Sequence, residues 1–272
     1  MVGSNSEGQV VMLIDIGANL TSQRFQKDLP LVIGRAQEAG VQVMIVTGTD
    51  RPNSEKAWQL SGSYPSVLYS TAGMHPHHAG DWNDKVAAVL QELTSQETVL
   101  AVGECGLDFN RNFSKPADQE RALHGQLELA ASCGLPVFLH ERDAHDRFFA
   151  ILGKYRDKLA GAVVHCFTGD EAALKAYLDL DCHIGITGWI CDERRGLHMH
   201  DFVHLIPDNR LMVETDAPYL LPRNIKNKPA GHRNEPMYLP VVVEQLAKIR
   251  GQSATEVAAV TTETAKVFFG IR

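Results

Sequence analysis

Short runs of apolar and β-branched residues recur along the chain, and a polar segment follows each of them. Most of these runs are continuously apolar rather than alternating, which is typical of parallel strands that are covered on both faces. The pattern predicts eight strands, at Val11–Asp15, Val41–Thr47, Val67–Ala72, Val99–Glu104, Pro136–His140, Ala162–His165, His183–Thr187 and Leu211–Glu214.

Between the predicted strands, apolar residues recur with the spacing of an amphipathic helix. Gly40 and Gly134 each follow such a segment, at the position where a glycine often ends a helix. Ser114 precedes Pro116, as a capping residue precedes a first-turn proline. The pattern predicts helices at Lys27–Ala39, Trp82–Leu93, Pro116–Ser132, Ala144–Tyr155, Glu171–Leu180, Met237–Lys248 and Thr255–Phe269.

The alternation of strands and helices indicates an α/β fold. Eight such units within 272 residues favour a single (β/α)₈ TIM-type barrel. The alternative is an open, doubly wound sheet, but no GxGxxG follows the first strand and no Pro/Gly/Ser-rich linker divides the chain. We therefore expect one barrel over residues 11–272, preceded by a disordered lead-in over residues 1–10.

Composition narrows the class of protein without identifying a function. The chain is 44% hydrophobic and 22% charged, as in ordinary globular proteins, and no apolar run approaches the ~20 residues that span a bilayer. The first ten residues do not resemble a signal peptide, and five cysteines lack CxxC spacing. We expect a cytoplasmic protein, without membrane partners and monomeric. A net charge of −7 argues against a protein that coats nucleic acid, but not against an enzyme that holds a few phosphates.

Histidine and carboxylate residues stand at the ends of several predicted strands. In a barrel of this kind the reactive groups lie at the C-terminal ends of the strands, so these side chains would converge although they are far apart in sequence. Glu104, His140 and His165 each close an apolar run, where an unpaired polar group would be costly to bury. Asp216 follows the last strand. Such a mixed set suits a divalent ion: magnesium, manganese or zinc.

A series of motifs makes a family resemblance specific. The chain reads GMHPH at 73–77, GECGLD at 103–108, FLH at 138–140, HCFTG at 165–169, IGITG at 184–188, ETDAPYL at 214–220 and RNEP at 233–236. These motifs, in this order, resemble those of the TatD family of metal-dependent deoxyribonucleases. The resemblance runs from about Leu13 to Arg272 and is closest in wording to enterobacterial members of the family.

The resemblance implies a metallo-dependent hydrolase related to the amidohydrolases, which acts as a 3′–5′ exonuclease on single-stranded DNA and on RNA. A role in DNA repair or nucleic-acid turnover is also implied. Carried over motif by motif, Glu104, His140 and His165 would bind the metal. Asp216 would be the remaining ligand and would accept the proton of the attacking water, and His75 would line the same site. Glu104 and Asp216 are thus the expected catalytic residues.

The chain departs from the family at its first strand. Most relatives carry a metal-binding DxHxH there, whereas this chain has Asp15, Gly17 and Asn19 at the three motif positions. We expect a second metal position that is weak, with Asp15 and Asn19 as its protein ligands. Oxygen ligands and water favour Mg²⁺ over tightly held Zn²⁺, and replacing Gly17 and Asn19 by histidine should raise zinc affinity.

Basic residues and two histidines are candidates for substrate binding. Arginine offers fixed, bidentate donors to phosphate, and Trp189, Phe109 and Phe113 are candidates for stacking on a base. The expected substrate-binding residues are His75, His77, Arg111, Arg194, Arg223 and Arg233.

Two other functions are compatible with the same residues. One is an ester or amide hydrolase, such as a D-aminoacyl-tRNA deacylase, since one barrel fold supports many chemistries. The other is a non-catalytic nucleic-acid-binding module. Retention of the converging ligands speaks against the module, and arginines near the site favour the nuclease.

Overall fold

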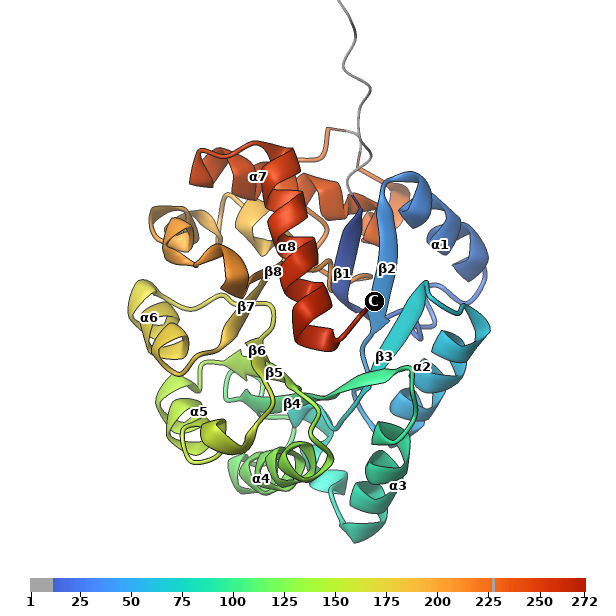
Figure 1. The fold of residues 1–272 in the computed structure, drawn as a ribbon, viewed down its shortest axis with the longest axis vertical. Helices are drawn as coiled ribbons and strands as arrows, with labels where there is room; N and C mark the ends of the chain where they lie inside the picture. Colours follow the sequence, from blue (N-terminus) through green and yellow to red (C-terminus); the bar gives the residue numbers. More distant parts are fainter. Residues whose placement is uncertain (1–11, 227) are drawn as a thin grey trace, which may run out of the picture.

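The chain folds into one barrel of parallel strands, seen in a computed structural model that describes residues 12–226 and 228–272. Eight strands form a single sheet in which each pairs in parallel with the next along the chain. A parallel bridge between Ala18 and Ala217 connects the end of the sheet to its beginning (Figure 1). This closure confirms the predicted (β/α)₈ barrel and excludes an open, doubly wound sheet.

All eight predicted strands are present, with shifted ends. β4 continues four residues past Glu104, whereas β6 and β8 each end one residue before the polar residue that was predicted to close them. The predictions for residues 1–10 and for Val11 lie outside the described residues. The strands are β1 (Leu13–Ala18), β2 (Val41–Val46), β3 (Leu68–Ala72), β4 (Val99–Asp108), β5 (Val137–Arg142), β6 (Ala162–Val164), β7 (His183–Ile186) and β8 (Leu211–Val213).

The seven predicted helices are present, and the structure adds an eighth, α2. It was missed because the residues that it buries, Ser54, Ala57 and Ser61, are small and leave no apolar stripe in the sequence. The capping prediction for Ser114 was wrong, because its hydroxyl contacts the segment after β3 instead. The helices are α1 (Leu29–Glu38), α2 (Arg51–Ser63), α3 (Asp84–Thr94), α4 (Pro116–Cys133), α5 (His145–Leu152), α6 (Glu171–Asp179), α7 (Leu239–Arg250) and α8 (Ala254–Phe269).

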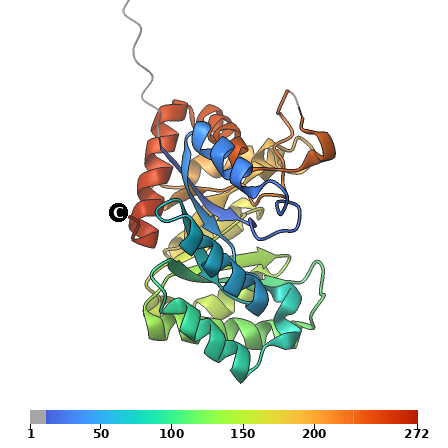
Figure 2. The same cartoon turned by 90° about the vertical axis from the view of Figure 1, so that its right-hand side faces the viewer.

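Apolar side chains fill the barrel itself as well as the layer between strands and helices. The inner cluster includes Ile16, Phe138 and Met212 from the strands and Phe269 from α8. Burying a large apolar side chain contributes roughly 1.5–3 kcal/mol, so this filling stabilises the barrel and blocks a through-channel. Helix α8 crosses the barrel opening in Figure 1, and Figure 2 shows the segment after β8 on the side away from α8. The site is therefore confined to one end.

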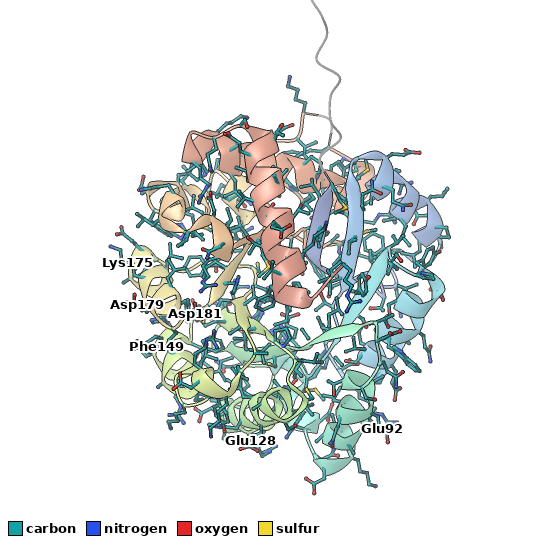
Figure 3. All side chains as sticks on the ribbon, viewed as in Figure 1. Glu92, Glu128, Phe149, Lys175, Asp179 and Asp181 are labelled. Carbon is teal, nitrogen blue, oxygen red and sulfur yellow. The ribbon has the colours of Figure 1, made fainter. Side chains whose placement is uncertain are left out.

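The outer surface of the helices is mostly polar and charged, with Leu31 and Val267 as exposed apolar exceptions. Figure 3 shows Glu92 of α3, Glu128 of α4 and Lys175 of α6 on the periphery, away from the barrel axis. Within residues 12–226 and 228–272, no helix has both the length and the apolar character to cross a membrane.

Candidate active site

A cavity of about 750 Å³ opens at the C-terminal ends of the strands. Every strand contributes to its lining, either directly or through the loop that follows it. The four residues predicted to converge, Glu104, His140, His165 and Asp216, all line this cavity, as do His75, His77 and Asn19. Residues nearly 200 positions apart in the sequence are thus brought together because parallel strands end at one face of the barrel.

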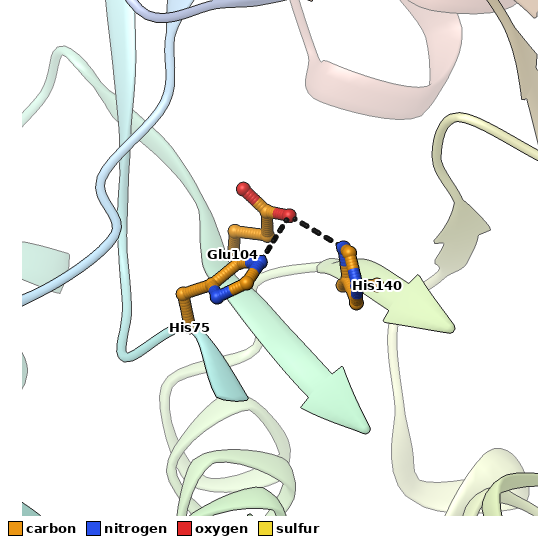
Figure 4. A group of neighbouring side chains, drawn as sticks. All are labelled: His75, Glu104 and His140. Carbon is orange, nitrogen blue, oxygen red and sulfur yellow. Dashed lines mark hydrogen bonds and ion pairs between the residues drawn. The ribbon is translucent and has the colours of Figure 1, made fainter. Parts of the chain in front are cut away.

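Glu104 lies at the centre of the cavity floor. Its Oε1 atom lies 3.3 Å from His75 Nε2, 2.9 Å from His140 Nδ1 and 2.8 Å from His165 Nε2. Figure 4 shows the first two contacts, with both imidazoles directed at one carboxylate oxygen. Ligand atoms of His75, Glu104 and His140 lie within 4.8 Å of one another. His75, which the sequence analysis placed with the substrate-binding residues, is therefore positioned as a metal donor.

Electrostatic coupling within this cluster is strong. Burial opposes ionisation of Glu104, but His165, His75 and His140 outweigh it and hold the pKa of that carboxyl well below its ordinary value. Burial also opposes charging of His165, but Glu104 and Glu214 outweigh it and raise its pKa well above the usual range. The cluster thus favours positive charge around the Glu104 carboxylate. A bound cation would supply that charge, as protons on the histidines do.

Asp216 lies in the loop after β8, with its backbone in the left-handed region at a φ of 54°. Its Oδ1 accepts a hydrogen bond of 2.8 Å from the Asn19 side-chain amide. Burial raises the pKa of Asp216 to about 7, against the opposite effect of the positive charge on His165. Non-glycine residues in this conformation are uncommon and are concentrated at functional sites. Asn19 and Asp216, joined by their hydrogen bond, both line the cavity.

Asp15 does not accompany Asn19. Its carboxylate is fully buried and accepts hydrogen bonds from the backbone N–H and the hydroxyl of Thr215, and from the backbone N–H of Gly17. Asp15 is not among the residues that line the cavity. Because its acceptor positions are used to join β1 to the segment after β8, the structure leaves Asn19, directly after β1, as the candidate ligand of the two.

Two carboxylates that the sequence analysis did not assign to the site hold its histidines. Glu214 is fully buried, lies 3.2 Å from His165 Nδ1 through Oε2, and accepts from the Cys166 backbone N–H through Oε1. Asp108 Oδ2 lies 2.7 Å from His77 Nε2 and 3.5 Å from His140 Nε2. Such carboxylates orient metal-binding histidines. The sequence feature that could have identified Asp108 and Glu214 is their position in the motifs GECGLD and ETDAP.

The space that the family's first histidine would need is already filled. A Cβ atom at Gly17 would collide with Glu214 Oε2 and lie 3.0 Å from Phe138 Cζ. Gly185 touches the other oxygen in the same way, since a Cβ there would lie 2.8 Å from Glu214 Oε1. The Gly17→His, Asn19→His change expected to raise zinc affinity would therefore displace Glu214 rather than simply restore two ligands.

The predicted substrate-binding residues divide into three groups. His77 and Arg111 line the cavity with His75, whereas Arg194 and Arg223 line a neighbouring hollow. Arg233 lines neither the active-site cavity nor the neighbouring hollow. Its guanidinium makes a bidentate pair with Asp28, at 2.8 and 2.7 Å, and also binds Glu235, so it anchors the loop after β8 to the start of α1. Arg142, Arg195 and Tyr219, which are not among the expected substrate-binding residues, also line the cavity.

The donors present fit a divalent cation. Three imidazole nitrogens are directed at one carboxylate oxygen, with a second carboxylate, Asp216, on the same cavity wall. Nitrogen and oxygen donors of this kind bind zinc and manganese, and carboxylates together with water bind magnesium. The residues that would hold the ion are His75, Glu104, His140, His165 and Asp216.

Comparison with known proteins agrees with this geometry. A model of the TatD related DNase family matches residues 14–270. The 3′–5′ ssDNA/RNA exonuclease TatD of Pectobacterium carotovorum is 51% identical over 94% of this chain and 99% of its own, and that of Erwinia amylovora is 50% identical over 95% and 100%. The crystal structure of YjjV, a TatD homologue from Escherichia coli, superposes with a TM-score of 0.88 at 28% identity, over 97% of this chain and 100% of the other. The chain therefore belongs to the TatD family of DNases and is a metal-dependent hydrolase by fold.

Proposed function

We propose that this protein is a metal-dependent 3′–5′ exonuclease that hydrolyses the phosphodiester bonds of single-stranded DNA and RNA. The observation that carries the proposal is the convergence of His75, Glu104, His140, His165 and Asp216 in one cavity at the C-terminal end of the barrel. Relatives at about 50% identity over nearly the whole chain are named for this activity. We infer a cytoplasmic role in nucleic-acid turnover or DNA repair.

The roles of the residues follow from their contacts. A divalent ion bound here, for which we propose Mg²⁺, would supply positive charge that acidifies water and offsets charge on phosphate oxygens. Asp216 faces the same space and is the carboxylate available to take the proton of the attacking water. Asn19 donates to Asp216 and so fixes the orientation of that carboxylate. Glu104 holds the three imidazoles around one point.

A recessed site favours a single strand. The catalytic carboxylates and imidazoles lie on the floor of the cavity, and Glu104 is only 5% exposed. A terminus must therefore enter, and separating a duplex end first carries an additional free-energy cost. Arg111, Arg142 and Arg195 at the lining are placed to hold the phosphates of the entering strand.

The test uses 5′-labelled single-stranded DNA, single-stranded RNA and duplex DNA, incubated with purified protein in magnesium, manganese, zinc or EDTA. We expect ladders that shorten from the 3′ end, faster on single strands than on duplex, and no cleavage in EDTA. A strand with a blocked 3′ terminus and a circular single strand should both resist. Undiminished cleavage in EDTA, or equal cleavage of the circle, would overturn the proposal.

Matched variants separate the site from general effects on folding. Glu104→Gln should abolish cleavage, whereas the same exchange at exposed Glu92 on the outer face of α3 should leave it unchanged (Figure 3). The same preparations tested on aminoacylated tRNA decide the ester-hydrolase alternative. Binding of strands without cleavage in any metal would favour the non-catalytic module.

A further inference from the structure

A second hollow adjoins the active-site cavity on the side of β7 and β8. It has a volume of about 410 Å³ and shares Trp189, Arg195 and Leu220 with the lining of the active-site cavity. Pro222 and Arg223, in the loop after β8, also line it. We call this hollow the side groove. Because the two hollows have these lining residues in common, a nucleic-acid strand that leaves the active-site cavity past Trp189 enters the side groove directly.

The side groove is positively charged on a protein of net charge −7. Among its described lining residues, four are cationic (Arg194, Arg195, Arg223 and Lys228) and one carboxylate is present, Asp192. Asp192 is buried and accepts from both Arg194 and Arg195, and Glu193 pairs with Arg223 at 2.7 Å. These two carboxylates fix the three guanidinium groups, and four cations against two carboxylates leave a local excess of positive charge. A positive groove that leads from a site for phosphodiester hydrolysis is complementary to a phosphate backbone.

A flat aromatic platform stands where the two hollows meet. Trp189 lies in a short 3-10 turn after β7, η3 (Gly188–Cys191), and its indole N–H donates to the backbone carbonyl of Arg195 at 3.2 Å. The Arg195 guanidinium lies over the same ring, 4.1 Å from its centroid. The Trp189 ring and the Arg195 guanidinium are thus already held together at the boundary between the two hollows. An aromatic ring beside an arginine can bind a single strand by stacking on a base and by attracting a phosphate.

Another aromatic residue stands across the mouth. Phe113 follows β4, is 68% exposed, and contacts His77 edge-on with ring centroids 4.7 Å apart. Phe113 follows β4 and Trp189 follows β7, three strands further round a barrel of eight, so the two rings stand on different sides of the opening. An exposed phenylalanine at the cavity lining is suited to cover a base that has entered the site.

We propose that a single strand crosses the mouth in one direction: its 3′-terminal base stacks on Phe113, and the nucleotides on its 5′ side stack on Trp189 and follow the side groove. The proposal rests on the proposed exonuclease function and adds the path of the substrate. The side groove sets the direction, because it extends the cavity past Trp189 and supplies cationic residues for several phosphates. The bond to be cleaved then lies over Glu104, between the two aromatic residues.

The test measures stacking directly, in EDTA so that no strand is cleaved. Ten-nucleotide single strands carry 2-aminopurine either at the 3′-terminal position or at the third position from that end. Binding should quench the fluorescence of both probes, because stacking on an aromatic ring quenches 2-aminopurine. Trp189→Ala should abolish quenching at the third position only, and Phe113→Ala at the terminal position only. Trp189→Phe, which keeps a ring, should restore the quenching.

Affinity and kinetics give a second readout. Trp189→Ala and Arg195→Ala should each weaken binding of the ten-nucleotide strand roughly tenfold, as the loss of one stacked base does, and should raise its KM in magnesium while leaving kcat nearly unchanged. A dinucleotide, which does not extend into the side groove, should lose much less affinity than the ten-nucleotide strand. Arg51→Ala and Leu31→Ala are the matched controls, since both residues are exposed on helices α2 and α1.

The outcomes distinguish this inference from the proposed function. If wild-type protein shortens strands in magnesium but Trp189→Ala leaves the third-position signal and the KM unchanged, the path is wrong and the function stands. If strands bind with the predicted quenching but no metal supports cleavage, the path stands and the proposed function fails. Loss of both probe signals in either single variant would also overturn the proposed direction.

Discussion

Replacing Gly17 in β1 by alanine should disturb the site by displacing the buried carboxylate of Glu214. The new Cβ atom would overlap Glu214 Oε2 and would also lie only 3.0 Å from Phe138 Cζ. Glu214 is fully buried and holds His165 Nδ1 at 3.2 Å and the Cys166 N–H. The substitution must therefore displace a buried carboxylate from its donors.

The expected loss of stability follows from these contacts. Overpacking a filled interior costs roughly 1–3 kcal/mol, and each strained hydrogen bond to a charged group adds about 1.5–3 kcal/mol. With partial relaxation we expect Gly17→Ala to lower the free energy of unfolding by about 3–5 kcal/mol. For a protein of this size that corresponds to a drop in Tm of about 10 °C. Magnesium affinity should fall with it, because His165 loses its orienting partner.

The control is the same substitution where space is free. A Cβ atom at Gly34 in α1 has no neighbour within 4 Å, so Gly34→Ala should stabilise the helix by about 0.5–1 kcal/mol. Both variants are compared by urea unfolding, by calorimetric Tm and by magnesium titration. A Gly17→Ala protein as stable as Gly34→Ala, with unchanged magnesium affinity, would refute the reasoning about Glu214.

Three further predictions concern individual side chains. Asp108→Asn should weaken magnesium binding about 10- to 100-fold in a calorimetric titration, because it removes the carboxylate beside His140. Arg233→Ala should lower the free energy of unfolding by about 1 kcal/mol and leave the KM for a dinucleotide unchanged; a raised KM would make it a substrate ligand. Burial, with help from Arg210, lowers the pKa of His183 to about 4, so only the unfolded chain gains its proton as pH falls below ~6.5. Wild type should therefore lose about 2 kcal/mol relative to His183→Gln between pH 7.5 and 5, measured by urea unfolding; parallel pH profiles of the two proteins would contradict it.

The arrangement of strands could be predicted from sequence because each strand carries its own signal. A parallel strand in a barrel is covered on both faces, so it appears as a continuous apolar run whatever its neighbours are. The candidate ligands were visible for a related reason, since Glu104, His140 and His165 interrupt apolar runs where an unpaired polar group would not be tolerated. Helix α2 was not predicted because the residues that it buries are serine and alanine, which give no apolar periodicity in the sequence.

The partners of these residues were decided only by the tertiary structure. Asp15 and Asn19 are only four residues apart in sequence, yet the Asp15 carboxylate accepts from Thr215 while the Asn19 amide donates to Asp216. Arg233 reads as a phosphate ligand in sequence, but Asp28, 205 positions away, takes its guanidinium. The sequence by itself determined which segments form strands and which polar residues end them, because those properties depend on neighbours along the chain. Which polar groups meet depends on barrel closure, which brings distant loops together and leaves each buried charge only the partners within its reach.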